Sequence, residues 1–182
     1  MKDVAVNPAV RIDLLSDTLT RPTSAMRQAM AQAEVGDDVF GEDPTTARLE
    51  HHIATLLGKE AALFMPSGTM SNAIGLLIHC NRGDEFLCEA GCHIYNNEQA
   101  GYAQLRGTAV QPITAAGGEL TLDHLRDAIR KEDVHLARTR LVCLEQTHNR
   151  AGGKVLPYEG IAEIAEQAWP QRSTAVAMAP SF

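Results

Sequence analysis

The chain has 182 residues, of which 45% are hydrophobic, and a formal net charge of −7 from 23 acidic and 16 basic residues. A chain of this size can bury a core and is ordinarily one domain. The acidic balance and the scattered basic residues argue against nucleic acid as a partner. No apolar run is long enough to span a bilayer and no signal sequence opens the chain, so we expect a cytoplasmic protein that binds no membrane.

The first predicted elements are short. Residues 1–10 have no hydrophobic period and are expected to be an N-terminal extension. Residues 11–20 are predicted to be extended, and a short helix is predicted to start at residues 21–24. After an acidic, glycine-containing loop at 35–43, the next helix has an Asp43-Pro44 start and a glycine end at position 58.

A possible phosphate site follows this helix. Residues 61–65 are an unbroken apolar run that predicts a buried parallel strand, and a Pro-Ser-Gly turn ends it. Residues 69–79 are apolar nearly all round, which predicts a helix buried deep in the domain. A strand, a turn of small residues and a helix N-terminus direct N–H groups to one point. The sequence therefore predicts either a phosphate site at Ser67, Gly68 and Thr69 or a simple helix cap.

Strands and helices alternate in the rest of the chain. Strands are predicted at 85–88, 108–114 and 140–145, amphipathic helices at 121–131 and from Pro157 onward, and a helix or loop at 93–102. This alternation predicts an α/β fold with a mostly parallel sheet.

The four cysteines are Cys80, Cys88, Cys92 and Cys143, and none of them forms a Cys-x-x-Cys pair. We expect reduced thiols. Cys88 and Cys92 with His93 are conceivable metal ligands, but their spacing matches no usual zinc pattern, so no metal site is predicted.

Five separated blocks carry a family resemblance. In chain order they are SDTLTRPT (16–23), VGDDVFGEDPT (35–45), GKEAALFMPSGTMSN (58–72), CHIYNNEQAG (92–101) and THNRAGGKVLP (147–157). Together they closely resemble the threonine aldolases of the aromatic amino acid β-eliminating lyase family. The resemblance implies the large domain of a type I pyridoxal phosphate-dependent transferase, similar to aspartate aminotransferase, with helices on both faces of a mostly parallel sheet. We expect this partial domain at residues 11–168.

The resemblance also implies roles for individual residues. Gly68 and Thr69, beside Ser67, match positions that bind the cofactor phosphate, and His93 matches the histidine stacked on the pyridine ring. His135 matches a second histidine near the reacting centre, although an exposed polar residue before a strand is an equal alternative. Ser16 matches a residue that lines the substrate carboxylate.

The implied reaction is the aldol cleavage of L-threonine and related 3-hydroxy amino acids to glycine and an aldehyde. The implied cofactor, pyridoxal 5'-phosphate, accepts the electrons of the broken Cα–Cβ bond. Sites of this family form between subunits, so the resemblance implies a homodimer or homotetramer for the full-length family, with Ser16 and residues 35–43 at the contact.

The sequence departs from the family pattern after Ala168. The family places a Schiff-base lysine and an Asp-Gly-Ala-Arg segment further along, but here no aspartate follows Asp133 and no lysine follows Lys154. We expect a family chain cut short, inactive alone and weak in cofactor binding, with an aberrant, poorly packed tail at 169–182; a shifted reading frame near the tail's end can encode Asp-Gly-Ala. The alternative is a non-catalytic domain that binds a phosphate ligand or a protein partner.

Overall fold

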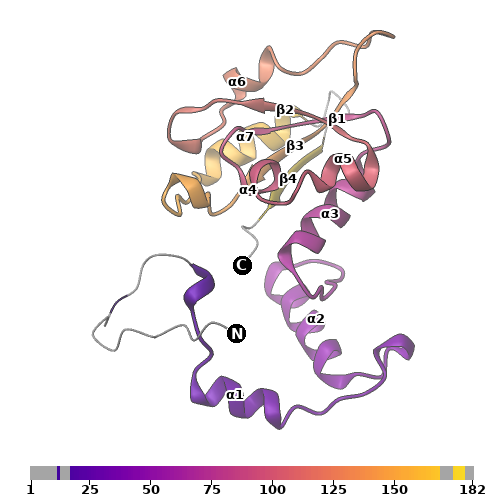
Figure 1. The fold of residues 1–182 in the computed structure, drawn as a ribbon, viewed down its shortest axis with the longest axis vertical. Helices are drawn as coiled ribbons and strands as arrows, with labels where there is room; N and C mark the ends of the chain where they lie inside the picture. Colours follow the sequence, from indigo (N-terminus) through magenta and orange to yellow (C-terminus); the bar gives the residue numbers. More distant parts are fainter. Residues whose placement is uncertain (1–11, 13–16, 169–173, 179–182) are drawn as a thin grey trace, which may run out of the picture. The chain divides into compact units, whose positions relative to one another are not determined.

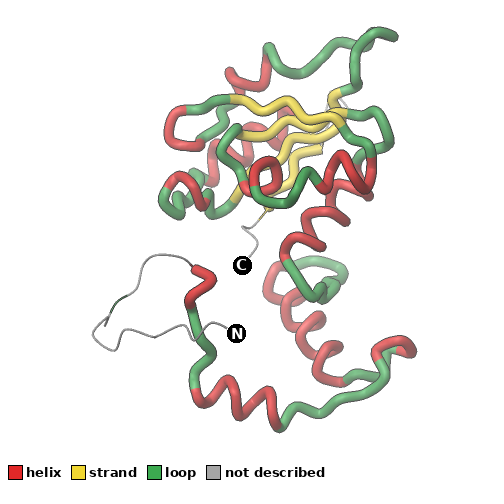
Figure 2. The backbone as a smooth tube through the Cα atoms, in the orientation of Figure 1, coloured by secondary structure: helices red, strands yellow, loops and turns green. Residues whose placement is uncertain are grey.

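The computed structural model describes residues 12, 17–168 and 174–178, the last five by their backbone (Figure 2). The chain falls into two compact units, residues 1–64 and residues 65–181, which are described separately. The predicted extension at 1–10 and the predicted substrate residue Ser16 lie outside the described residues. No described helix has the length and apolar character needed to cross a bilayer.

The first unit consists of short helices joined by loops. Helix α1 spans Ser24–Ala31 and begins where the Thr23 hydroxyl accepts the N–H of Met26. Helix α2 spans Pro44–Leu57; the Asp43 carboxylate accepts the N–H of Thr46 at 2.7 Å, and Gly58 ends the helix in the left-handed conformation. These caps confirm the predicted start of α1 and both predicted ends of α2. The unit also has 3-10 turns at Asp17–Leu19, where an extended chain was expected, and at Asp38–Phe40.

Very little of the first unit is buried. Among its described residues only Ala54 is buried, while Val39, Phe40 and the apolar end of α2 are exposed. Helices α1 and α2 are amphipathic, so their apolar faces are available for contacts beyond those the unit makes within itself.

The strand predicted at residues 61–65 is wrong: these residues form no strand. Leu63 and Phe64 are exposed, and the N–H of Phe64 donates to the Glu50 side chain at 2.7 Å. The segment pairs with no described strand, and a side chain of α2 satisfies the N–H of Phe64 instead.

The second unit contains a four-stranded parallel sheet (Figure 1). The strands are β1 (Glu85–Glu89), β2 (Ala109–Ile113), β3 (Thr139–Glu145) and β4 (Thr174–Met178), in the order β2-β1-β3-β4. The first three confirm the predicted strands. The fourth pairs with β3 along its length, so this part of the expected aberrant tail has a regular backbone.

Alternating side chains of β1 and β3 bury both faces of the sheet. Phe86, Cys88, Leu141 and Cys143 face one core, which includes residues of α3 (Gly68–His79) and α4 (His93–Asn96) and packs against α5 (Gly101–Arg106). Leu87, Val142 and Leu144 face a second core with α6 (Leu122–Arg126) and α7 (Tyr158–Ala168). The result is the predicted α/β arrangement with helices on both faces (Figure 1).

Strand β2 is an edge of the described sheet and contains Pro112. The N–H of Ala109 donates to Asp84 and the carbonyl of Ile113 accepts from Ala90, so the polar groups of these residues face β1. Because successive residues of a strand alternate in direction, the nitrogen of Pro112 faces away from β1.

Helix α3 is half-buried, so the prediction that it lies deep in the domain is wrong. Asn72 and Leu76 are buried against the unit, whereas Met70 and Ile78 are exposed, because the helix covers one face of the sheet and its outer side meets solvent. The carbonyl of His79 accepts from Arg140 at the start of β3, so the N-terminal turn lies toward the carboxyl ends of the strands.

Candidate functional site

Polar side chains gather where β1 and β3 end. Each strand finishes with a buried glutamate, Glu89 in β1 and Glu145 in β3, and each glutamate is followed within four residues by a histidine, His93 at the start of α4 or His148 in a loop. The carboxyl ends of parallel strands are where α/β sheets bind ligands. We call these residues, with Asn72 and Glu98, the carboxyl-edge cluster.

His93 is held at its backbone and at its ring. Its N–H donates to Glu145 Oε2 at 2.5 Å, and its Nδ1 lies 2.9 Å from Glu98 Oε1. The Asn72 side chain of α3 donates to the same Glu98 oxygen at 2.7 Å. The side chains of His93 and Glu98 are 15% and 4% exposed, so this chain of polar groups is largely shielded from water. It connects α3 to the first residue of α4.

A second pair, Glu89 and His148, lies at the same edge. His148 Nε2 is 2.8 Å from Glu89 Oε2, and the same oxygen accepts the N–H of Gly91. His148 is 2% exposed, and among the described residues its Nδ1 has no hydrogen-bond partner. A Cβ on Gly118 would lie 2.8 Å from His148 Cδ2, so only glycine fits there. The sequence did not reveal this pairing, because the two residues are 59 positions apart.

The predicted phosphate site forms the N-terminus of α3. The Ser67 hydroxyl accepts the N–H of Met70 at 3.1 Å and caps the helix. The N–H groups of Gly68 and Thr69 precede the first intrahelical bond, and Thr69 is exposed. Backbone donors at a helix N-terminus together with a hydroxyl are a donor set that suits a phosphate.

The structure does not bring His135 to this edge. His135 is exposed in the loop between α6 and β3, and its N–H donates to Asp133. It therefore lies beyond the amino end of β3, whereas His93 contacts Glu145 at the carboxyl end. The catalytic role assigned to His135 stays a prediction.

Buried carboxylates at the amino ends of the strands pair with arginine. Asp84 lies 3.1 Å from Arg138, and Glu85 lies 2.9 Å from Arg130. The Glu85 hydrogen bond raises the pKa of Arg130. We call these four residues the amino-edge pairs. A cavity of about 780 Å³ lies beside them, lined by residues 129–134, 136 and 138–140.

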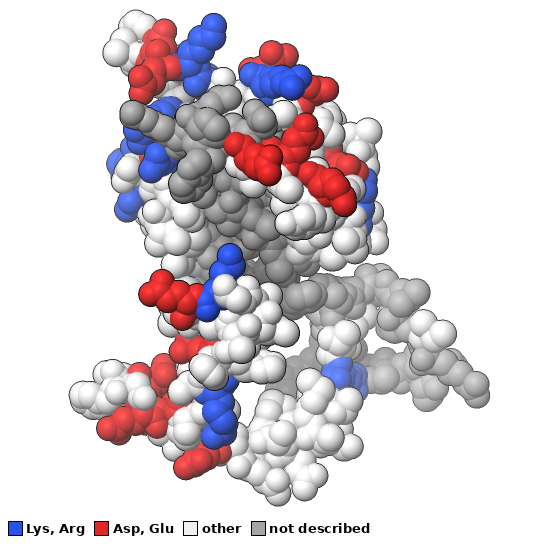
Figure 3. Space-filling model, turned by 180° about the vertical axis from the view of Figure 1, so that it is seen from behind, with Lys and Arg blue, Asp and Glu red and all other residues white. Residues whose placement is uncertain are grey.

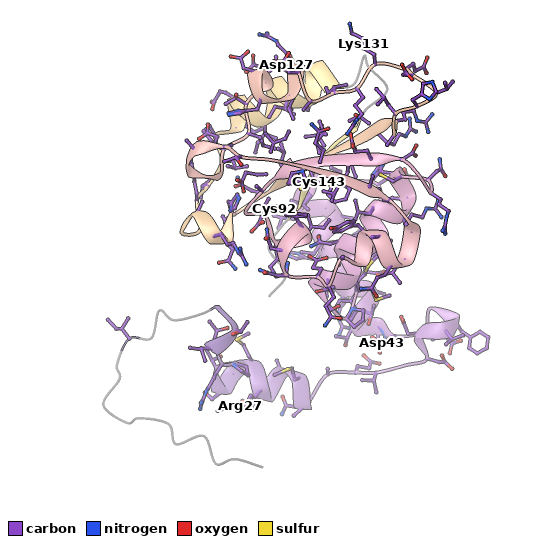
Figure 4. The ribbon with its side chains drawn as sticks, turned by 45° about the horizontal axis from the view of Figure 1, so that its top comes forward. Arg27, Asp43, Cys92, Asp127, Lys131 and Cys143 are labelled. Carbon is purple, nitrogen blue, oxygen red and sulfur yellow. The ribbon has the colours of Figure 1, made fainter. Side chains whose placement is uncertain are left out.

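The four cysteines are free and buried in one core cluster. Figure 4 shows Cys92 and Cys143 within the second unit, on the side of the sheet that faces α4. Burial raises the pKa of Cys80 to about 11 and that of Cys143 well above its usual value, which keeps both as neutral thiols. No group of three or more potential metal ligands occurs within the part of the chain that the structure describes.

Comparison with known proteins identifies threonine aldolases among the relatives of this chain. The family model for beta-eliminating lyases matches residues 13–173. A low specificity L-threonine aldolase of Escherichia coli K12 is 50% identical over 156 residues, and a low-specificity L-threonine aldolase of Arabidopsis thaliana is 47% identical over 161. These matches cover 85% of this chain but only 46% and 44% of the relatives, so the chain spans less than half their length. A threonine aldolase structure from Leishmania major shares the fold with a TM-score of 0.71 at 18% identity, over 84% of this chain and 44% of that one.

Proposed function

Because the chain belongs to the beta-eliminating lyase family, we propose that it provides part of a pyridoxal 5'-phosphate site for the aldol cleavage of L-threonine and related 3-hydroxy amino acids. The products are glycine and an aldehyde. The reaction is proposed for a chain of the relatives' full length that carries these residues, since the 182 residues cover less than half of it.

The observation that carries the proposal is the link between α3 and His93. Asn72 lies one turn into α3 and reaches His93 through Glu98, so the N-terminal turn of the helix and the imidazole belong to one connected group of side chains. A cofactor with a phosphate at one end and an aromatic ring at the other requires these two elements close together.

In this proposal each element has a separate task. The N–H groups of Gly68 and Thr69, with the Thr69 hydroxyl, bind the cofactor phosphate, and Ser67 caps the helix that presents them. His93 packs on the pyridine ring. Bound pyridoxal phosphate supplies the electron sink for the carbon–carbon bond that breaks. The roles of Ser16 at the substrate carboxylate and of His135 near the reacting centre are supported by the family resemblance alone.

No lysine of the second unit is available beside His93 among the described residues. Lys131 lies beyond the amino end of β3, and the Nζ of Lys154 is engaged by Glu119 at 2.6 Å. We therefore propose that the 182 residues bind the cofactor weakly and form no stable lysine adduct by themselves.

The proposal includes a subunit contact. The exposed apolar residues of the first unit, among them Val39 and Phe40, suit an interface with a second copy, as a homodimer or homotetramer requires. Analytical ultracentrifugation of the 182-residue chain should give a dimer or larger species, and a monodisperse monomer would contradict the proposed subunit contact.

The cofactor proposal is tested by titrating the chain with pyridoxal phosphate and following absorbance and fluorescence. We expect saturable, weak binding, and no pyridoxyl-lysine peptide after borohydride reduction and mass mapping. For the reaction, the full-length protein is incubated with L-threonine, and acetaldehyde is measured with alcohol dehydrogenase. A full-length protein that binds the cofactor but releases neither glycine nor acetaldehyde would overturn the proposed substrate.

A further inference from the structure

We propose that Glu98, supported by Asn72, fixes the imidazole of His93 in the tautomer that carries its proton on Nδ1. Glu98 is thus a positioning residue that acts through His93. The functional meaning of this role rests on the proposed cofactor site, but the tautomer itself can be measured without any cofactor.

The geometry identifies the direction of each hydrogen bond. Glu98 Oε1 lies 2.7 Å from the Asn72 amide nitrogen and 2.9 Å from His93 Nδ1. An amide nitrogen only donates and an ionised carboxylate only accepts. The short contact from His93 therefore requires a proton on Nδ1, and the lone pair of the neutral ring is then on Nε2.

Burial makes this bond strong. Counted over the whole residue, backbone included, Glu98 is 9% exposed and Asn72 is 6% exposed, so water competes poorly for either side chain. A charge-assisted hydrogen bond is roughly twice as strong as a neutral one. The second bond, from Asn72, holds the carboxylate in place and prevents it from turning away from the ring.

The backbone of His93 is held by a different carboxylate. Glu145 accepts the His93 N–H with one oxygen and the Asn149 N–H with the other. Glu145, Asn72 and His93 line the same cavity of about 10 Å³. The main chain and the ring of His93 are therefore fixed by two separate buried glutamates, and this separation gives the experiment its control.

The consequence for the site is a defined ring face and a defined basic nitrogen. With Nδ1 bound to Glu98, a rotation of the ring by 180° would break the charge-assisted bond. An imidazole fixed in this way keeps one orientation toward a stacked aromatic ligand, and the lone pair of its neutral ring is on Nε2.

The test is long-range proton–nitrogen NMR of the ¹⁵N-labelled 182-residue chain without cofactor, at a pH where the His93 ring is neutral. In the wild-type chain we expect the Nδ1–H form in about tenfold excess. Glu98→Gln keeps a neutral acceptor and should reduce the excess to about two- or threefold. Glu98→Leu removes the acceptor and should make the Nε2–H form the major one. Asn72→Ala should lower the excess less than Glu98→Leu does.

Glu145→Gln is the matched control. It changes an equally buried carboxylate that contacts the same residue at its backbone, so the Nδ1–H excess should persist. If Glu98→Leu does not fold by circular dichroism, the wild-type chain and Glu98→Gln decide the question. A wild-type ring protonated mainly on Nε2, an unchanged excess in Glu98→Gln, or equal loss in Glu145→Gln would overturn the proposal.

A cofactor titration of the same variants separates this inference from the proposed function. If pyridoxal phosphate binds, Glu98→Gln should weaken the affinity severalfold, and Glu98→Asp should restore part of it. If the Nδ1–H excess is present but no variant or wild-type chain binds the cofactor, the tautomer assignment stands and the proposed weak binding of the cofactor by these 182 residues fails.

Discussion

The two ends of the parallel sheet both bury carboxylates, but they neutralise them differently. At the amino ends, Asp84 and Glu85 pair with the guanidinium groups of Arg138 and Arg130. At the carboxyl ends, Glu89 and Glu98 bond to imidazoles and Glu145 bonds to backbone N–H groups. Arginine remains charged at every physiological pH, whereas an imidazole can change its protonation state or tautomer.

This difference indicates a division of roles within one fold. The amino-edge pairs are permanent ion pairs that join β1 to the loop before β3, and they suit stability. The carboxyl-edge cluster holds its histidines by directional bonds, and it suits proton handling or ligand binding. Both acidic and basic side chains lie on the face of the second unit that Figure 3 shows.

The largest effect on stability should come from the amino edge. Arg130→Met leaves Glu85, which is 2% exposed, without its cationic partner. We expect the melting temperature, measured by circular dichroism, to fall by roughly 5–10 °C. Arg126→Met removes the exposed pair with Asp123 and should change the melting temperature by no more than about 1 °C. Equal effects would contradict the assignment of the amino-edge pairs to stability.

The carboxyl edge can be disturbed through a glycine. Gly118→Ala combines a positive φ of 74° with a Cβ 2.8 Å from the His148 ring, so it should cost about 2–3 kcal/mol in free energy of unfolding. Gly152→Ala has a similar φ of 80° but no atom within 4 Å, and should cost about 1 kcal/mol. Urea denaturation measures both. If the two losses are equal, the contact with His148 is not what excludes a side chain at position 118.

A charge at the predicted phosphate site, the N-terminus of α3, should affect cofactor binding more than stability. Gly68→Asp places a carboxylate at the N-terminus of α3, where it stabilises the helix dipole but repels a phosphate. We expect the affinity for pyridoxal phosphate to fall about tenfold or more. Gly68→Asn has nearly the same size without the charge and should lose much less. Fluorescence titration that finds equal losses would show steric exclusion in place of charge repulsion.

The last effect appears only at high pH and concerns Cys80, near the amino edge. Burial, followed by the Asp84 carboxylate, raises the pKa of this thiol from 9.0 to about 11. The folded state therefore disfavours the thiolate. The contribution of Cys80 to stability is complete below pH 9, where the thiol is neutral in both the folded and the unfolded state, and is lost as the pH rises to about 11. Cys80→Ala should show a shallower fall in stability over this window than the wild type. The native thiols should also react slowly with iodoacetamide at pH 8 and quickly in denaturant.

Features set by neighbouring residues could be predicted from the sequence. The boundaries of α2 follow from Asp43-Pro44 and Gly58, and the strands β1, β2 and β3 follow from short apolar runs. Helix α6 is shorter than predicted: it ends at Arg126, and the N–H of Ala128 donates to Leu125, three residues back, in a turn. The apolar run at 61–65 also misled the prediction, because a run cannot reveal whether a partner strand is available.

The site depends on pairings that no local pattern contains. The α3 N-terminus was predicted from the local pattern of turn and helix, and His93 through the family blocks; side chains of α3 and His93 belong to one connected group. The partners Asn72 and Glu98 are 26 residues apart, and Glu89 and His148 are 59 apart. These residues come together only in the folded chain, where β1 and β3 are neighbours in the sheet and α3 packs against them.

Pro112 makes one edge of the sheet less suitable than the other for pairing with a further strand. Its nitrogen lies on the open side of β2, where a neighbouring strand would need a donor, so the hydrogen-bond ladder of any strand added there would be interrupted. The side of β4 is free of this defect at the described residues, Thr174–Met178. A further strand, from this chain or another, therefore joins more readily beside β4, and β2 resists the edge-to-edge association that leads parallel sheets to aggregate.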